Sequence, residues 1–452
     1  MYLLLSSKGY EQNEYLVNGT MAFSYLPGTT IEQISDIWIN RKANKDEVLP
    51  LSMNLVVYGN GGSRSISFSG DFLVFIDEQG FINIKPDDFF LLDGEEIRGK
   101  LGFGLMRLPV TDPQDMGSID KELVKQMIDS FIEQGFTYFD TAWMYCGFKS
   151  EDSMKDCLTS RYPRESYTLT TKLHAGFIHS LEDRDKIFEE QRRKTGVEYF
   201  DYYMLHDMGY DHYAIYNKFD CFTWIQEKKA QGLVKHIGFS CHDNAEFLEM
   251  ALTEHPEFEF VQLQVNYLDW ESNAIQSRLC CEVCKKHGKP VIVMEPVKGG
   301  TLAQGPAEVE QAFKNYLPDM SIPSWAIRFA ASQEPVELVL SGMSNMEQLL
   351  DNTSYMAQFQ PMNEEELLLV KQAEQAINAN IAIPCTGCSY CTDGCPQNIA
   401  IPRYFSLYNA DKQEVKSKGW TPHGEYYDRL TMHFGKASDC LECGQCESMC
   451  PQ

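Results

Sequence analysis

Three consecutive stretches decide the fold of the central part of the chain. They are Tyr167-Thr-Leu-Thr-Thr-Lys-Leu173, then Leu181-Glu-Asp-Arg-Asp-Lys-Ile-Phe-Glu-Glu-Gln-Arg-Arg-Lys-Thr195, then Phe200-Asp-Tyr-Tyr-Met-Leu-His206. The outer two are short apolar runs of strand length, and the middle one has the length and spacing of an amphipathic helix. A strand, a helix and a second strand in this order indicate a parallel βαβ unit.

The same alternation extends over about 250 residues, which is the usual size of a TIM barrel. Eight strands are predicted, at 101–108, 137–142, 167–173, 200–206, 234–240, 260–267, 290–297 and 336–343. Helices are predicted between them, for example at 120–134, 181–195, 219–231, 245–254 and 325–332. The alternative is a doubly wound open sheet, but no G-x-G-x-x-G motif follows a strand. We therefore predict a (β/α)8 TIM barrel over residues 98–362.

Residues 1–97 form the predicted first domain, which is small and mostly β. Short strands are expected at 55–58, 65–68, 72–76 and 81–84, and a short helix at 31–38. A docking module, a lid over the barrel and a scaffold are all compatible with this composition.

Eight of the 15 cysteines form two matching runs near the C-terminus, in the predicted third domain at 363–452. Each run has the spacing C-x2-C-x2-C-x3-C-P, in which three thiolates of one loop hold one four-iron cube and the fourth reaches the other. We expect one [4Fe–4S] cluster on Cys385, Cys388, Cys391 and Cys450, and a second on Cys440, Cys443, Cys446 and Cys395. Zinc is the alternative, but it favours separate CxxC pairs. The domain resembles a bacterial two-cluster ferredoxin with segment 397–439 inserted. We expect this segment to pack the domain onto the barrel, and the alternative is that it folds over the barrel mouth and lines the pocket.

Composition excludes several classes of function. The formal charge is −26 and the pI is about 4.8, so the basic footprint of a nucleic-acid binder is missing. No run of about 18 apolar residues predicts a membrane span, and a cytoplasmic protein is expected. In a reducing compartment, the remaining seven cysteines are expected to be buried thiols. They are Cys146, Cys157, Cys221, Cys241, Cys280, Cys281 and Cys284.

Polar residues at the C-terminal ends of barrel strands are the catalytic candidates. They are Asp140, Lys172 and His206, with Tyr145 in the loop after Asp140. Tyr145 can protonate a carbonyl oxygen, Lys172 is expected to lower the pKa of Tyr145, Asp140 to orient Lys172, and His206 to donate a hydrogen bond. Each residue alone also fits a structural role, as a snorkelling lysine, a structural histidine or a packed tyrosine.

Residues 100–360 resemble the aldo-keto reductase family. The resemblance is carried by Leu101-Gly-Phe-Gly-Leu-Met-Arg-Leu-Pro109, Phe139-Asp-Thr-Ala-Trp-Met-Tyr145, Thr170-Thr-Lys-Leu173, Met204-Leu-His-Asp207, Ile237-Gly-Phe-Ser240, Gln262-Leu-Gln-Val-Asn-Tyr267, Met294-Glu-Pro-Val-Lys-Gly-Gly300 and Ser341–Asn352. The resemblance implies a catalytic tetrad of Asp140, Tyr145, Lys172 and His206.

The resemblance also implies that NADP(H) or NAD(H) binds across the barrel mouth. The nicotinamide would meet Ser240, Gln264 and Asn266, and the pyrophosphate would run beside Pro296 and Lys298. The adenosine end would meet Ser344, Gln348, Asp351 and Asn352. Residues 341–352 contain no Arg or Lys for a 2′-phosphate, which leaves Lys298 as the candidate.

The sequence thus predicts a nicotinamide-dependent oxidoreductase that reduces a small carbonyl compound, or oxidises the alcohol, and carries two iron–sulfur clusters. The clusters are expected to exchange electrons either with the barrel or with a ferredoxin or another redox partner. Because hydride moves two electrons and each cluster one, a bound flavin would be the natural converter, although no flavin motif is visible. The alternative is a non-catalytic iron–sulfur sensor whose barrel only binds a ligand.

Overall fold

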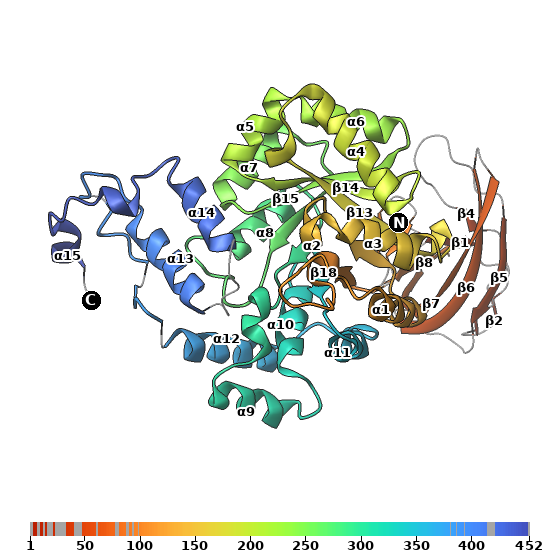
Figure 1. Cartoon of the computed structure of the whole chain (residues 1–452). Coiled ribbons are helices and arrows are strands. Elements are labelled where there is room, and N and C mark those ends of the chain that lie inside the picture. The colour runs from red at the N-terminus through yellow and green to blue at the C-terminus, as the bar shows by residue number, and fades with distance from the viewer. Residues whose placement is uncertain are drawn as a thin grey trace. The chain divides into compact units, whose positions relative to one another are not determined.

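The computed structural model divides the chain into two compact units, Met1–Arg98 and Gly99–Gln452 (Figure 1). In the first unit it describes the backbone of the strands. In the second unit it describes residues 99–379, 381–385, 387–392, 394–413 and 421–450 with their side chains. Within these described parts no helix is long and apolar enough to cross a membrane.

The first unit is built on an antiparallel sheet, in agreement with the β-rich prediction. The strand order is β4-β1-β8-β7-β6-β5. The bounds are β1 (Leu3–Ser6), β4 (Met21–Ala22), β5 (Gln33–Ile39), β6 (Val48–Gly59), β7 (Gly62–Ile76) and β8 (Phe81–Pro86), with the short pairs β2 (Tyr10–Glu11) and β3 (Glu14–Tyr15), and β9 (Phe90–Leu92) and β10 (Glu95–Ile97). The helix predicted at 31–38 is wrong, because β5 occupies that stretch and pairs with β6. Its Ile- and Trp-rich sequence favours a strand.

The second unit contains a closed barrel of eight parallel strands, which confirms the predicted TIM barrel. The strands follow in chain order: β11 (Leu101–Gly104), β12 (Tyr138–Asp140), β13 (Thr168–His174), β14 (Phe200–Met208), β15 (Val234–Cys241), β16 (Phe260–Gln264), β17 (Val291–Met294) and β18 (Val336–Gly342). β11 pairs with both β12 and β18, which closes the ring. All strands run in one direction, so their C-terminal ends share one mouth.

Helices surround the strands (Figure 1). They are α1 (Lys121–Glu133), α2 (Tyr145–Phe148), α3 (Ser150–Met154), α4 (Leu181–Thr195), α5 (Tyr210–Lys218), α6 (Cys221–Ala230), α7 (Ala245–Glu254), α8 (Ser277–Lys286), α9 (Ala307–Tyr316), α10 (Ile322–Ala331) and α11 (Met346–Met356). α4 shows how local sequence sets the ends of a helix. Ser180 and Asp183 form a capping box at its start, and Gly196 ends it with φ 71°.

The C-terminal part of the second unit shares its core with the barrel. α12 (Glu364–Asn378) packs Val370 and Ala373 against Trp325 and Phe329 of α10. α13 (Ile401–Gln413) and α14 (Pro422–Leu430) enclose a second cluster in which buried residues of segment 397–439 contact Ala274 and Ile275 of a barrel loop. The short α15 (Gln445–Met449) follows. Segment 397–439 therefore attaches the cysteine-rich domain to the barrel, as predicted.

Candidate functional site

Asp140, Lys172 and Tyr145 meet at the barrel mouth. Asp140 ends β12, Lys172 lies on β13, and Tyr145 opens α2. Lys172 Nζ lies 2.5 Å from Asp140 Oδ1, 2.9 Å from the carbonyl oxygen of Thr141 and 3.4 Å from Tyr145 Oη. Lys172 is fully buried. Asp140 at the end of β12, Tyr145 shortly after it, and Lys172, 32 residues after Asp140 on β13, thus form one hydrogen-bonded acid–base group.

His206 on β14 lies beside this group. Its ring meets the Tyr145 ring edge to face, with 5.8 Å between the centroids. Its buried Nδ1 has no hydrogen-bond partner among the described residues. Because an unpaired buried nitrogen costs free energy, this nitrogen needs a partner that the described residues do not supply.

Burial dominates the titration of the four groups. It raises the pKa of Asp140 and lowers the pKa of Lys172, and the attraction between the two charges partly offsets both shifts. Burial lowers the pKa of His206 well below its usual value, and the charge of Lys172 adds to the effect, so the imidazole is neutral at pH 7.

The pKa of Tyr145 differs from the sequence-based expectation. We expected the Lys172 ammonium to lower it, but burial raises it well above the usual value, and the negative charges of Asp140, Glu295 and Asp207 raise it further. Tyr145 is therefore a phenol at neutral pH, which is the protonation state that a general acid needs.

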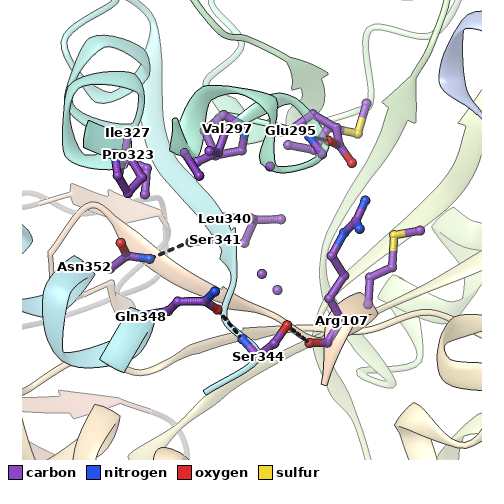
Figure 2. A pocket seen from close by; sticks show the side chains of 18 of the residues that line it. Arg107, Glu295, Val297, Pro323, Ile327, Leu340, Ser341, Ser344, Gln348 and Asn352 are labelled. Carbon is purple, nitrogen blue, oxygen red and sulfur yellow. Dashed lines mark hydrogen bonds between the residues drawn. The ribbon is translucent and has the colours of Figure 1, made fainter. Parts of the chain in front are cut away.

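One cavity of ≈ 360 Å³ connects Tyr145 and Asp140 with the start of α11. Figure 2 shows Arg107, just beyond the end of β11, with its side chain directed across this cavity toward Glu295. Arg107 is the one Lys or Arg among the described residues that line the cavity. A cation in the middle of the cavity and a helix N-terminus at its far end are two features that attract phosphate.

The structure separates the predicted cofactor residues into two groups. Pro296, Ser344, Gln348, Asp351 and Asn352 line the cavity, whereas Ser240, Gln264, Asn266 and Lys298 are not among its lining residues. Ser240 Oγ instead accepts a hydrogen bond from the backbone N–H of Asp207.

Lys298, Gln264 and Asn266 all bind one buried carboxylate, that of Asp269. Lys298 Nζ lies 2.6 Å from Asp269 Oδ1, and the amides of Gln264 and Asn266 donate to Oδ2 at 2.8 and 2.6 Å. Lys298 is 1% exposed. Our suggestion that Lys298 meets a cofactor phosphate is therefore not supported, because its charge is already paired inside the protein.

Several residues that line the cavity were not among the predicted site residues, and three of them carry polar or charged side chains that bear on its chemistry. Gln262 lines the cavity and donates from Nε2 to Asp140 Oδ2 at 3.3 Å, whereas Gln264, two residues later on the same strand, turns to Asp269. Glu295 lines the cavity and accepts a hydrogen bond from the N–H of Gly299. Arg107 lies just after a strand end, and the rule that found Asp140 could have found it too.

The described residues of the two cysteine runs share two backbone features. The second and fourth residues after the first cysteine have positive φ in both: 70° and 62° at Gly387 and Ser389, and 54° and 70° at Glu442 and Gly444. In both runs the second residue's N–H also donates to the sulfur of the first cysteine at 3.4 Å, Gly387 to Cys385 and Glu442 to Cys440. Loops that turn their amides toward thiolate sulfur suit an iron–sulfur cluster, so the donor set and its backbone fit the expected group.

The structure also brings the two runs together. Burial raises the pKa of Cys391, and the nearby thiols of Cys385, Cys388 and Cys446 add to the shift. Cys446 belongs to the other run. The seven cysteines outside the runs are all buried, as predicted.

Fold and site together define a barrel protein with a hydrogen-bonded group of ionisable residues at its mouth and a cysteine-rich C-terminal domain packed against it. Residues 100–375 match the family model described as "Aldo/keto reductase family", and residues 384–452 match a "4Fe-4S dicluster domain". The chain therefore belongs to the aldo/keto reductase family of oxidoreductases and carries a 4Fe–4S dicluster domain, as its sequence predicts.

Individual relatives are distant. The chain is 22% identical over 278 residues to "Uncharacterized oxidoreductase YqkF" of Bacillus subtilis, a match that covers 55% of this chain and 86% of that protein. It is 26% identical over 172 residues to "9,11-endoperoxide prostaglandin H2 reductase" of Trypanosoma cruzi, covering 37% of this chain and 55% of the relative. Among solved structures, the thermostable aldo-keto reductase Tm1743 in complex with the inhibitor epalrestat has a TM-score of 0.50 at 20% identity, and the match covers 62% of this chain and 97% of that chain. This last likeness concerns the fold alone.

Proposed function

We propose that the chain is a nicotinamide-dependent carbonyl reductase, or alcohol dehydrogenase in reverse, whose acid–base group is Asp140, Tyr145, Lys172 and His206. The observation that carries the proposal is the position of Lys172 Nζ, 2.5 Å from Asp140 Oδ1 and 3.4 Å from Tyr145 Oη, because both of these partners line the cavity. A reduced nicotinamide bound in this cavity supplies the hydride.

The protein's own residues handle the proton and the developing charge. Tyr145 Oη gives its proton to the carbonyl oxygen, and the ammonium of Lys172 stabilises the phenolate that remains. Asp140 keeps that ammonium charged and fixes its position. The neutral imidazole of His206 donates a hydrogen bond to the same carbonyl oxygen.

The rest of the cavity suits a dinucleotide. Tyr145 fixes the end at which the nicotinamide must lie, so the pyrophosphate falls near Arg107 and the adenosine near the start of α11, beside Ser344 and Gln348. This assignment moves the phosphate contact from Lys298, as first expected, to Arg107.

We also propose the cluster ligands given by the cysteine spacing. Cys385, Cys388, Cys391 and Cys450 would hold one cluster, and Cys440, Cys443, Cys446 and Cys395 the other. When bound, these clusters exchange single electrons, and a ferredoxin-like redox partner is the proposed source or acceptor. The positive φ angles at matching positions and the N–H···S contacts of the two runs support this assignment.

The acid–base assignment is tested on protein purified without oxygen. Oxidation of NADPH and NADH is followed against a panel of aldehydes and ketones. Tyr145→Phe is expected to lower carbonyl turnover by roughly 10²–10⁴-fold, because it removes the proton donor while leaving the ring in place. Fluorescence titration should show that the variant still binds the nucleotide. Unchanged turnover in Tyr145→Phe contradicts the assignment.

The cluster assignment has a separate test. Cys388→Ala is expected to lower iron and acid-labile sulfide content and to abolish reduction of viologen dyes. Cys157→Ala, which removes a buried thiol outside the runs, is the matched control and should keep both. Dye reduction that survives Tyr145→Phe but is lost in Cys388→Ala identifies an electron route separate from carbonyl reduction. The absorbance spectrum of the purified protein shows in the same experiment whether a flavin is bound.

A further inference from the structure

Arg429 of α14 is a buried arginine that extends from the cysteine-rich domain into the barrel mouth. Its side chain is 1% exposed. NH1 lies 2.9 Å from Asp207 Oδ1, Nε lies 3.0 Å from Asp211 Oδ1, and NH2 lies 3.3 Å from Glu425 Oε1. Two of these carboxylates belong to the barrel and one to α14 itself. An uncompensated buried charge costs free energy, and these three carboxylates compensate the charge of the guanidinium and hold it in one position.

The guanidinium also binds the ends of two barrel strands. NH1 donates to the carbonyl oxygen of His242, just after β15, at 2.9 Å. NH2 donates to the carbonyl oxygen of Asp207, on β14, at 3.1 Å. Arg429 therefore holds both backbone and side chain of Asp207, the residue that directly follows His206.

The backbone after His206 is shaped around this contact. Asp207 has a φ of 56°, a conformation that costs a non-glycine residue free energy unless its surroundings enforce it. A Cβ at Gly209 would lie 2.3 Å from Arg429 Nε, so only glycine fits there. On the opposite side, the N–H of Asp207 donates to Ser240 Oγ at 2.7 Å. The segment that carries His206 is thus held between β15 and the arginine.

A metal ion is a poor alternative occupant of this place. His174, Asp207 and His212 bring one ligand atom each within 4.8 Å of one another, a grouping that could hold a cation. However, the Arg429 guanidinium already pairs with Asp207, and its NH2 lies 3.5 Å from His212 Nδ1. A second cation beside a buried guanidinium would be repelled.

We propose that Arg429 is a positioning residue through which the iron–sulfur domain fixes His206 in the acid–base group of the barrel. The inference rests on the proposed function, because it concerns the geometry of that reaction. In this proposal the cysteine-rich domain exchanges electrons and also helps to hold the catalytic site in place.

Charge gives the same contact a second effect. Burial alone would raise the pKa of Asp207, but His242 and Arg429 outweigh it and hold the pKa below its usual value. Without Arg429, the buried carboxylate of Asp207 would have no permanent cation beside it. The titratable groups around it would be His174, Asp211, His212, His242 and Glu425. Asp207 also contributes to the raised pKa of Tyr145. Loss of Arg429 should therefore change the pH profile of turnover as well as its rate.

The test compares Arg429→Met and Arg429→Lys with Arg403→Met, a control that removes an arginine of α13 stacked over Phe434. Arg429→Met is expected to lower kcat by roughly ten- to a hundredfold, as small displacements of catalytic groups do, with KM and nucleotide binding unchanged. The acidic limb of its pH–rate profile should move to higher pH. Without Arg429, the Asp207 carboxylate favours the protonated forms of the neighbouring His174 and His242. Arg429→Lys should keep part of the wild-type kcat, and the control Arg403→Met should keep all of it.

The double variant Arg429→Met/Asp207→Asn separates charge from position. It should return the acidic limb to the wild-type pH while kcat stays low, because the contacts to the two carbonyl oxygens are still missing. If Arg429→Met does not fold, the double variant and Arg429→Lys are used for the test instead.

Iron content and the absorbance of the reduced and oxidised clusters are measured for every variant. Wild-type kcat in Arg429→Met with intact clusters overturns the proposal. A loss of kcat that only follows a loss of cluster content also overturns it. Tyr145→Phe is run in parallel: if it turns over carbonyls as fast as the wild type, the proposed function fails instead.

Discussion

The Lys172–Asp140 pair is the most demanding feature at the scale of single residues. Both side chains are buried, at 0% and 3% exposure. Removing their charges from water costs more free energy than a typical surface salt bridge contributes. Such a pair persists only with further hydrogen bonds, which Thr141, Tyr145 and Gln262 provide. The proposed acid–base role explains why the chain keeps two charges where an apolar pair would pack.

This cost leads to a stability prediction. Lys172→Met removes one partner and leaves a buried carboxylate, so the free energy of unfolding should fall by about 3–5 kcal/mol. Asp140→Asn/Lys172→Met should regain most of the loss, because the double variant buries no charge. Urea unfolding followed by circular dichroism measures both. A double variant as unstable as the single one contradicts the argument.

Arg107 leads to a binding prediction. As the one cation lining the cavity among the described residues, it should contribute most of the charge that attracts a pyrophosphate. Arg107→Met is expected to weaken nucleotide binding by roughly tenfold or more, since a hydrogen bond to a charged group contributes about 1.5–3 kcal/mol. Fluorescence titration against increasing salt measures it, and the salt dependence should shrink in the variant. Arg193→Met, on the exposed face of α4, is the control, and equal weakening there points to net charge alone.

The sequence predicted the position of a residue well where that position follows from the strand pattern, and poorly where it depends on a distant packing partner. Asp140, Tyr145, Lys172 and His206 follow from strand ends, because the barrel brings those ends together. Gln262 and Gln264 lie on the same strand two residues apart, and only the packed structure shows that Gln264 turns to Asp269 while Gln262 reaches the cavity. The role of Lys298 was misjudged for the same reason, since its partner Asp269 lies 29 residues earlier in the chain.

At the scale of elements, the eight strands and the main barrel helices could be predicted because their patterns are periodic and their ends are capped. β5 was predicted as a helix because a short apolar run has no decisive period, and its pairing with β6 determined the outcome. α2 was predicted as a loop. It is a single turn in which Cys146 and Gly147 have positive φ, a conformation that no sequence period indicates.

In the proposed binding mode, α11 is the element that decides which nucleotide binds. Its N-cap, Asn345, accepts a hydrogen bond from the N–H of Gln348, and Gln348 in turn accepts one from the N–H of Ser344. Asp351 and Gln348 line the far end of the cavity, and residues 341–352 bring no Lys or Arg to it. A 2′-phosphate carries about two negative charges at neutral pH, so this end should favour NADH over NADPH.

Gln348→Arg tests this property of the helix. An added cation at the cavity should raise the affinity for NADPH by roughly tenfold and leave that for NADH nearly unchanged, because only NADPH carries the extra phosphate. Leu350→Arg, which adds the same charge on an exposed face of α11, is the control. Wild-type protein that already binds NADPH much more tightly than NADH contradicts the argument.

At the scale of the whole molecule, the barrel and the cysteine-rich domain are not independent parts. Buried residues of segment 397–439 share a core with Ala274 and Ile275, and Arg429 pairs with Asp207 across 222 positions of sequence. The cysteine spacing predicted the kind of C-terminal domain from local pattern alone. The contact of Arg429 with the barrel could not be predicted, because an arginine in an amphipathic helix usually faces solvent.

The histidines collected at this junction give the whole molecule a pH-dependent stability. Burial lowers the pKa of His174 and of His242 to about 4, from an ordinary value of 6.5 in the unfolded chain. Between those values the unfolded chain binds more protons than the folded one, so folding stability falls as the pH drops from about 6.5 to about 4. Each imidazole accounts for at most about 3 kcal/mol over that window.

Urea midpoints measured between about pH 7 and pH 5 should therefore fall with pH, and His242→Gln should make the slope shallower because it removes one of the two protonation sites. His179→Asn, in an exposed loop, should leave the slope unchanged. Cluster absorbance recorded at each pH separates acid loss of iron from protonation of the imidazoles, since only the latter reverses on returning to neutral pH. A His242→Gln variant with the wild-type slope would place the proton uptake on other groups and remove His242 from this account of the junction.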